Sequence, residues 1–475
     1  MSGTSGVFGA VDLGASGGRV MAGVVTGRQI ALEPVYRFDN KMTLVDGHVR
    51  WNLSELFAEV VTGLRQLARR HPDVVSIGID TWAVDYALLD ERGELLAEPI
   101  AYRDNRTDGV HAAVHRIVSR KRLYEINGLQ FLPFNTIYQL EAERNSAVWP
   151  RARHAVLLPD LLAYWLTGQL RTEMTNASTT GLLDVAARTM SAELGELLKL
   201  PPDLFPPLTE PGEVIGTITA GMSRLTGLPE QTTVVAVGSH DTASAVVGVP
   251  AASRSFAFVS SGTWSLVGVE LDQPVLSDEA RLANFSNEGG VDRRIRFLRN
   301  VGGLWLLQES LRTWREAGVR HDPSVLHAQA ADLDRGGPTI DVDDPQFIPP
   351  GDMPERIRQK CHLAGRSAPQ TPAVIVRCIL DSLAVAYATT LRQAQQLSDK
   401  EVDVIHIVGG GSQNELLCQL TADLAGLDVL SGPVEATALG NIMVQARTQG
   451  SLNGDLDQLR ARLRTQLDLR RYQPQ

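Results

Sequence analysis

The chain has 475 residues, of which 43% are hydrophobic and 21% are charged, and its formal net charge at pH 7 is −10. This composition is typical of a globular protein of two or three domains. Residues 1–6 do not fit a secretion signal. No apolar run is expected to reach the roughly 20 residues of a membrane span. The acidic balance argues against general binding to nucleic acids or membrane surfaces, so we expect neither partner. The three cysteines form no CxxC and no metal-ligand spacing, so we expect a reduced, cytoplasmic protein.

Residues 7–25 contain two apolar runs around a small polar turn, Ala15-Ser16-Gly17-Gly18-Arg19. Because the turn leads into a second strand-like run and not into a helix, we expect a β-hairpin, unlike a Walker or dinucleotide loop. Glycine lets successive backbone N–H groups line a concavity that suits phosphate oxygens. Taken alone, the segment still favours a plain hairpin.

A capping pattern at Asn52 starts a helix with apolar residues at helical spacing. Residues 74–79 follow as a buried strand that runs into Asp80, Trp82 and a second acid, Asp85. Carboxylates accept hydroxyl protons and an indole ring covers a C–H face, so this strand end suits a polyol. A capped loop with a half-buried tryptophan explains the same residues equally well.

Three stretches are expected to be loops. The charged run 102–108 is typical of a solvated loop, and the proline-rich residues 199–212 predict an irregular one. The polar stretch 321–354 is the third, and its acidic run 341–345 lacks the glycine and the terminal glutamate of a calcium loop.

The centre of the chain carries Ser239, His240, Asp241 and Thr242 after an apolar strand predicted at residues 232–237. Polar groups at the edge of a buried pattern need partners, and a ligand is one such partner. The same residues also fit a strand end whose side chains satisfy nearby backbone groups. We expect neighbouring side chains of a strand end to point apart, which excludes a hydrolase built on His240 and Asp241.

Residues 254–270 repeat the form of the first hairpin, with two β-like arms around a small polar turn that contains Thr263. The two turns lie about half a chain apart. This spacing suggests two related domains, each of which donates a phosphate-holding hairpin to a shared cleft.

The remaining segments mix strands and helices. A strand at 295–298 ends at Asn300, a glycine-containing stretch then leads to Gln308 and a helix, and a core helix is predicted at 374–397. Residues 404–408 form a buried strand that runs into Gly409-Gly410-Gly411-Ser412-Gln413-Asn414 and a helix, an order that lets a nucleotide approach the backbone. Another helix of small residues begins near Glu435.

In chain order, the Asp-Leu-Gly hairpin, His-Asp-Thr, Ser-Ser-Gly-Thr-Trp and Val-Gly-Gly-Gly-Ser-Gln-Asn resemble the motifs of the FGGY carbohydrate kinases. Supporting stretches span nearly the whole chain, at residues 78–82, 102–104, 287–290, 303–306 and 343–345. The resemblance implies an α/β fold of the actin, hexokinase and Hsp70 type (ribonuclease H-like), with a nucleotide cleft between two domains. Residues 1–247 would bind the sugar and carry the first hairpin, and residues 248–475 would carry the second hairpin and bind the adenine nucleotide.

The resemblance also implies an enzyme that uses ATP and Mg²⁺ to phosphorylate the C1 hydroxyl of a ketose, with L-rhamnulose in L-rhamnose catabolism as the expected substrate. Asp241 is the expected general base, and Asp12 is expected near Mg²⁺, through water. The residues expected to contact ATP are Ala15, Ser16, Gly17, Gly18, Arg19, Thr263, Gln308 and Gly410. Those expected to contact the ketose are Asp80, Trp82, Ala83, His240, Asp241, Thr242 and Asn300.

One departure from the family pattern bears on the substrate. The family has a sugar-contacting glycine where this chain has Ala83, and a methyl group there crowds the sugar, so L-fuculose or xylulose stays open as an alternative. Ser412 stands where cysteine is common in relatives, which is a tolerable change. A rival from another class is an actin-like ATP-binding regulator, which would not need Asp80, Trp82 or Asp241. The sequence leaves open a monomer or a small homo-oligomer and the pairing of Cys361 with Cys378.

Overall fold

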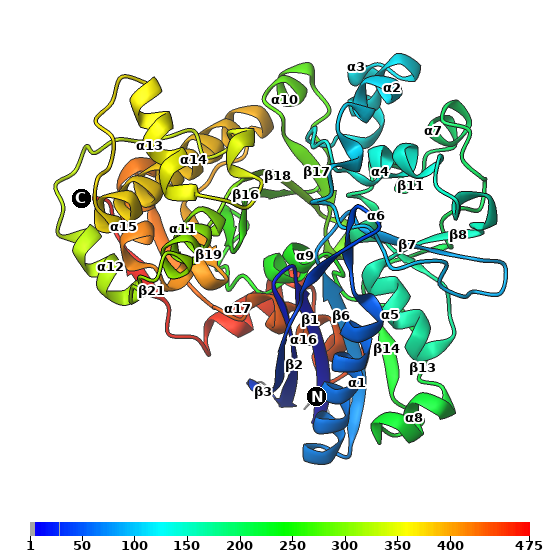
Figure 1. Cartoon of the computed structure of the whole chain (residues 1–475). Coiled ribbons are helices and arrows are strands. Elements are labelled where there is room, and N and C mark those ends of the chain that lie inside the picture. Colours follow the sequence, from blue (N-terminus) through cyan, green and yellow to red (C-terminus); the bar gives the residue numbers. More distant parts are fainter. Residues whose placement is uncertain (1–4, 28) are drawn as a thin grey trace. The chain divides into compact units, whose positions relative to one another are not determined.

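The computed structural model describes residues 5–27 and 29–475, which form two compact units (Figure 1). The first unit comprises Met1–Ala252, Leu271–Phe297 and Ala436–Gln466. The second comprises Ser253–Glu270, Leu298–Glu435 and Leu467–Gln475. Each unit therefore combines separate stretches of the chain, and the functional division into residues 1–247 and 248–475 stays a prediction.

A six-stranded sheet in the order β13-β14-β6-β1-β2-β3 forms the centre of the first unit. Its strands are β1 (Gly6–Gly14), β2 (Gly17–Thr26), β3 (Gln29–Asp39), β6 (Val74–Thr81), β13 (Val214–Thr217) and β14 (Thr233–Val235). The predicted first hairpin is confirmed, because β1 and β2 are antiparallel and joined by the two-residue turn Ala15-Ser16. Strands β14, β6 and β1 are parallel, so their carboxyl ends share one edge of the sheet, where α/β proteins commonly bind ligands.

Helices α1 (Leu53–Arg70) and α5 (Leu158–Thr167) pack against this sheet, as do α9 (Asp241–Val247) and α16 (Ala436–Thr448). Helix α1 begins as predicted, since the Asn52 side chain accepts a hydrogen bond from the N–H of Glu55. Figure 1 shows α16, drawn in red, beside β1 and β2, drawn in blue, although these elements come from opposite ends of the sequence.

Glycine allows α9 and α16 to pack backbone against backbone. A Cβ atom at Gly440 of α16 would lie 1.9 Å from the carbonyl oxygen of Ser244 in α9. One at Gly248, which ends α9, would lie 2.2 Å from the carbonyl oxygen of Ala436. Neither position accepts a larger residue unless the helices move apart.

The rest of the first unit consists of short elements. Its other strands are β4 (Met42–Val45), β5 (His48–Trp51), β7 (Tyr86–Leu89), β8 (His154–Leu157), β9 (Thr172–Glu173), β10 (Leu183–Asp184), β11 (Thr189–Met190), β12 (Leu208–Thr209) and β17 (Ser286–Gly289). Its other helices are α2 (Val110–Ile117), α3 (Arg120–Asn127), α4 (Thr136–Glu143), α6 (Met174–Ala177), α7 (Ala192–Leu197), α8 (Ala220–Thr226), α10 (Asp278–Leu282) and α17 (Leu456–Arg464).

The strands of the second unit have the sheet order β18-β16-β15-β19-β20-β21. The start of β18 belongs to the first unit, as does β17, its neighbour in the sheet. They are β15 (Phe256–Ser261), β16 (Trp264–Leu271), β18 (Ile295–Gly302), β19 (Val404–Val408), β20 (Asp428–Ser431) and β21 (Arg470–Tyr472). The helices of this unit are α11 (Trp305–Glu316), α12 (Pro323–Ala331), α13 (Met353–Leu363), α14 (Pro372–Ser398) and α15 (Glu415–Ala425). The second predicted hairpin is confirmed, because β15 and β16 are antiparallel.

Two predicted loops differ from the structure. The stretch 321–354 contains α12, which Asp322 starts by accepting the N–H of Ser324, with a proline at the first helical position. In the run 102–108, Tyr102 and Asp104 are buried and not solvated. The carboxylate of Asp104 accepts the N–H of Val49 at 2.7 Å, which explains why a charged residue is tolerated there.

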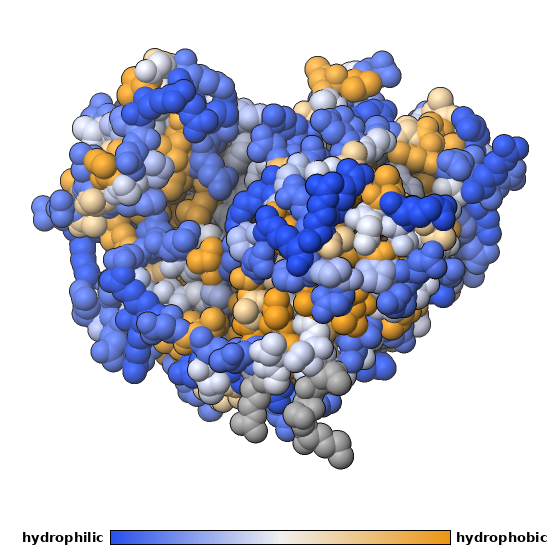
Figure 2. All heavy atoms as spheres, turned by 90° about the horizontal axis from the view of Figure 1, so that it is seen from below, coloured by the Kyte–Doolittle hydropathy of each residue, from blue (hydrophilic) through white to orange (hydrophobic). Residues whose placement is uncertain are grey.

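Helix α14 is long and apolar enough to cross a membrane by length and composition, so the expectation that no run approaches that length was wrong. However, 78% of its most apolar window is buried inside the protein, as in a core helix. On the face seen in Figure 2, hydrophobic side chains lie in patches among hydrophilic ones. Cys378 of this helix and Cys361 are both free and buried.

Candidate functional site

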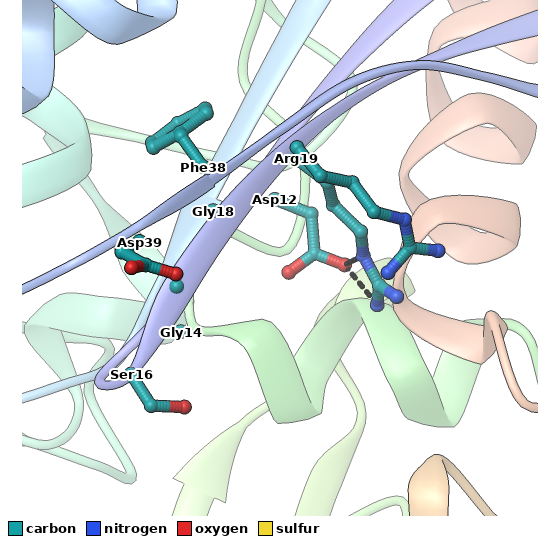
Figure 3. A pocket seen from close by; sticks show the side chains of 9 residues that line it. Asp12, Gly14, Ser16, Gly18, Arg19, Phe38 and Asp39 are labelled. Carbon is teal, nitrogen blue, oxygen red and sulfur yellow. Dashed lines mark hydrogen bonds and ion pairs between the residues drawn. The ribbon is translucent and has the colours of Figure 1, made fainter.

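The turn of the first hairpin borders a pocket of about 420 Å³ in the first unit (Figure 3). Its lining residues are Asp12, Gly14, Ser16, Gly17, Gly18, Arg19, Arg37, Phe38 and Asp39. A Cβ atom at Gly18 would lie 2.4 Å from the ring of Phe38, so packing alone requires glycine there. The structure thus brings Asp12 together with the residues that the sequence predicts along the phosphates, and Ala15 lies in the same turn.

Arg19 on β2 reaches across to Asp12, its partner in register on β1 (Figure 3). Its Nε and Nη2 atoms donate to Oδ2 of Asp12 at 2.8 and 2.6 Å. A guanidinium fork fits a carboxylate and a phosphate with the same geometry. Arg19 is therefore suited to either partner.

Three carboxylates lie near the carboxyl ends of neighbouring segments at one edge of the sheet. Asp12 on β1 is paired in register with Asp80 on β6, and the N–H of Thr81 donates to the carbonyl of Ser239 at 2.9 Å, which brings Asp241 to the same edge. Burial raises the pKa of Asp80 well above its ordinary value, and the charges of Asp12 and Asp241 raise it further. Within residues 5–27 and 29–475, no three His, Cys, Asp or Glu side chains form a direct metal site.

A polar network behind Asp80 was not predicted. Asn441 of α16 donates to Oδ2 of Asp80 at 2.6 Å, and Gln445, one turn later, donates to Oδ1 of Asn441 at 2.6 Å. Oδ1 of Asp80 is buried and has no hydrogen-bond partner among the residues that the structure describes. Leaving such a group unpaired costs about 1–3 kcal/mol, so this atom fits a site completed by a ligand or water.

Trp82 is packed into the core of the first unit. Its indole N–H donates to Asp85 at 2.9 Å, and the indole N–H of Trp51 donates to the same carboxylate oxygen at 2.6 Å. Ala83 is half-buried, whereas Asp80 and Thr81 at the strand end are fully buried. Contacts of Trp82 and Ala83 with a sugar stay predictions.

Val84 has a φ of 68°, a left-handed conformation that β-branched residues rarely adopt. The hydroxyl of Thr136 donates to its carbonyl oxygen at 2.6 Å, and the amide of Gln139 donates at 3.2 Å. Such strain persists only where surrounding contacts hold it, and it is common at binding sites. The turn that contains Ala83 is therefore a candidate part of the binding site.

His240 is the cap residue before α9, and Asp241 is the first residue of that helix. The expectation that their side chains point apart was wrong, since Nε2 of His240 lies 3.4 Å from Oδ1 of Asp241. The chain changes from extended to helical between them, which turns the two side chains to the same side. Ser239 does not pair with His240, because its hydroxyl donates to the buried Glu173 at 2.6 Å.

Behind His240 lie two further residues to which the sequence gave no role. Oε2 of Glu288 on β17 is 3.2 Å from Nδ1 of His240, and Nη1 of Arg296 on β18 is 3.1 Å from the same Oε2 atom. Glu288 belongs to the Asn-Glu-Gly-Gly stretch, so the only signal for it was the family motif.

The second hairpin is enclosed by two other segments of the second unit. The N–H of Trp305, at the start of α11, donates to the carbonyl of Thr263 at 3.1 Å, and Gln308 follows in the first turn of that helix. On another side, a Cβ atom at Gly411 would lie 2.0 Å from the hydroxyl of Ser261. A Cβ atom at Gly410 would meet no described atom within 4 Å, so packing does not require this glycine. Asn300 lies half-buried on β18.

Comparison with known proteins identifies the family. Sequence models of the FGGY family of carbohydrate kinases match residues 7–248 for the N-terminal domain and residues 257–448 for the C-terminal domain. The chain belongs to the FGGY family of carbohydrate kinases. This membership confirms the resemblance and makes the protein a carbohydrate kinase.

Relatives of this FGGY kinase cover nearly the whole chain. It is 40% identical to a rhamnulokinase of Bacteroides thetaiotaomicron over 98% of this chain and 96% of that protein. It is 43% identical to a rhamnulokinase of Pectobacterium atrosepticum over 98% of this chain and 92% of that protein.

Solved structures confirm the expected α/β fold. The chain is similar to gluconate kinase from Lactobacillus acidophilus, with a TM-score of 0.79, 17% identity and coverage of 99% of this chain and 94% of that one. It is also similar to Plasmodium falciparum glycerol kinase with ADP, with a TM-score of 0.76, 14% identity and the same coverage.

Proposed function

We propose that this FGGY kinase transfers the γ-phosphoryl group of ATP to the C1 hydroxyl of L-rhamnulose and releases L-rhamnulose 1-phosphate and ADP. The rhamnulokinase relatives at 40–43% identity support the substrate. The observation that carries the chemistry is the arrangement of Asp12, Asp80 and Asp241 at one edge of the sheet. A cytoplasmic monomer or small homo-oligomer is part of the same proposal.

The first hairpin fits the phosphates of ATP and a hydrated Mg²⁺. The carboxylate of Asp12 is the type of ligand that Mg²⁺ prefers, and Arg19 and the turn would bind phosphate oxygens. When bound, Mg²⁺ neutralises charge on the phosphates. In the second unit, Thr263, Gln308 and Gly410 would contact the nucleotide, and the open space at Gly410 supports a close approach.

Asp241 would accept the proton of the ketose hydroxyl. Its side chain is 34% exposed, which leaves the carboxylate accessible beside the buried His240. His240, Thr242 and Asn300 would hold the ketose, with Ala83 and the segment Asp80–Trp82 beside it. Phosphoryl transfer depends mainly on positioning and charge, to which a general base adds roughly 10²- to 10⁴-fold.

Measurement of ADP release with MgATP and a panel of L-rhamnulose, L-fuculose, L-xylulose, D-xylulose and glycerol tests this function. We expect a clear preference for L-rhamnulose. A preference for another ketose would overturn the substrate and leave the kinase chemistry in place. Slow ATP hydrolysis that no sugar stimulates would instead favour the regulator.

A further inference from the structure

Three side chains from separate segments meet behind Asp241 in the first unit. His240 precedes α9, Glu288 lies on β17 and Arg296 lies on β18, and their side chains are 7, 4 and 0% exposed. Nη1 of Arg296 is 3.1 Å from Oε2 of Glu288, and Nε donates to the carbonyl of Gly289 at 2.9 Å. We refer to His240, Glu288 and Arg296 as the His240 cluster.

The Nδ1 side of the His240 ring faces both an acceptor and a donor. Oε2 of Glu288 and Nη2 of Arg296 each lie 3.2 Å from Nδ1. A neutral imidazole that accepts from Arg296 at Nδ1 must carry its proton on Nε2, and an imidazolium that donates to Glu288 also carries one there. Both of these states present an Nε2–H to Oδ1 of Asp241, 3.4 Å away, a length that commonly shortens when substrate binds. A neutral ring that donated from Nδ1 to Glu288 would present none, but its Nδ1–H would face the guanidinium of Arg296, which can only donate.

The buried charges of the cluster are balanced. Burial alone would raise the pKa of Glu288, but the guanidinium of Arg296 and the His240 ring hold that pKa below its ordinary value, so the carboxylate is ionised. A buried ion pair is weak evidence for stability, because an apolar pair of similar volume is often as stable. The placement of this pair against His240 therefore favours a part in the chemistry.

The contacts of Asp241 act on one of its two oxygens. Oδ1 accepts hydrogen bonds from the N–H and the hydroxyl of Thr242 and faces Nε2 of His240. With Oδ1 held in this way, Oδ2 is the oxygen suited to the hydroxyl of the substrate.

We infer that Glu288 and Arg296 are positioning residues for the kinase reaction, which fix the His240 ring so that its Nε2–H holds Oδ1 of Asp241 and leaves Oδ2 for the ketose hydroxyl. This inference rests on the proposed function. The proton of the hydroxyl moves to Oδ2 as the bond from the hydroxyl oxygen to the γ-phosphorus forms and the bond from that phosphorus to the β-phosphate oxygen breaks. The cluster itself neither gains nor loses a proton.

The variant Glu288→Gln tests the inference by removing the charge while keeping the shape. We expect kcat to fall on the order of 10²-fold, because a small displacement of a reacting group has an effect of this size. The KM for ATP should stay unchanged, since the variant does not alter the first hairpin. A fall in kcat without a change in the KM for ATP would separate misplacement of the base from a general loss of structure.

The matched control is Asp381→Asn in α14, which also turns a buried arginine-paired carboxylate into an amide. Asp381 pairs with Arg377 at 2.9 Å, and the side chains are 12 and 4% exposed. We expect this variant to keep the wild-type kcat. An equal fall of kcat in both variants would overturn the inference, as would a wild-type kcat in Glu288→Gln.

A second measurement reads the protonation of the His240 ring in the wild-type protein. The ¹⁵N shifts of the wild-type His240 ring, assigned by their loss in His240→Gln, report which nitrogen carries the proton. We expect Nε2 to be protonated at neutral pH, and a ring protonated only at Nδ1 would overturn the inference. If the wild-type protein phosphorylated no ketose of the substrate panel, that result would instead refute the proposed function.

Discussion

The carboxylate of Asp241 is the residue on which the proposed chemistry depends most directly. We expect Asp241→Asn to lower kcat by roughly 10²- to 10⁴-fold, since an amide cannot accept the hydroxyl proton. ATP affinity should stay within about twofold of wild type, since the residues expected to bind the phosphates, Asp12 and Arg19, pair with each other on the first hairpin. Turnover assays and titration with a fluorescent ATP analogue measure the two effects. Wild-type turnover would refute the base assignment.

Ala83 is the residue whose substitution we expect to change the preference among ketoses. It precedes Val84, whose left-handed conformation is fixed by Thr136 and Gln139, so the Cβ of residue 83 has little freedom to move away from a sugar. One methyl group in a pocket is worth about 1–3 kcal/mol. We expect Ala83→Gly to lower the KM for L-rhamnulose with no change in the KM for ATP. An unchanged ratio of kcat/KM values across the ketose panel would show that residue 83 does not face the sugar.

The sequence predicts part of this site for a physical reason. Asp12, Asp80 and Asp241 each follow or end a strand that local patterns reveal, so the edge that they share could be expected. Glu288 and Asn441 lie far along the chain from their partners His240 and Asp80, and no local pattern encodes such a pairing. Their placement required the three-dimensional fold.

At the scale of elements, the contact between α9 and α16 gives a sharp test of packing. We expect Gly440→Ala to destabilise the protein by about 1–3 kcal/mol, because the added Cβ atom would lie 1.9 Å from the carbonyl of Ser244. The matched control is Gly195→Ala in α7, where a Cβ atom meets nothing within 4 Å among the described residues. There alanine should stabilise by about 0.5–1 kcal/mol, through its higher helix propensity. Urea unfolding measures both, and equal effects would contradict the contact.

Elements with a clear periodicity of apolar residues, or with a buried apolar run, were predictable from the sequence. Examples are the two hairpins, β6, α14 and β19. Helix α12 was missed because it is short and starts with Asp-Pro inside a polar stretch. The start of α9 at Asp241 was missed because the helix is short and most of its residues are small, a pattern that does not distinguish helix from strand.

At the scale of the whole molecule, buried acids make stability depend on pH. Burial and the charge of Glu173 raise the pKa of Asp160 well above the 3.8 of an unfolded chain. The protonated form therefore favours folding, a contribution that is present below pH 3.8 and is lost as pH rises through the raised pKa. We expect Asp160→Asn to be more stable than wild type at pH 8, on the order of 1–3 kcal/mol, with a smaller difference at pH 5. Urea unfolding at both values measures this, and a difference that shrinks with rising pH would contradict it.

The segmented first unit has a consequence for synthesis of the protein. Helix α16 packs against its sheet and donates hydrogen bonds to it, from Asn441 to Asp80 and from Gln445 to the carbonyl of Gly9. The side chain of Gln466 also accepts the N–H of Ile30. A ribosome delivers the N-terminal strands first, but the residues that pair with their polar groups lie 361 to 436 residues later in the chain. The first unit therefore stays incomplete until those later residues have been synthesised, and chaperones that shield exposed strands have that interval in which to act.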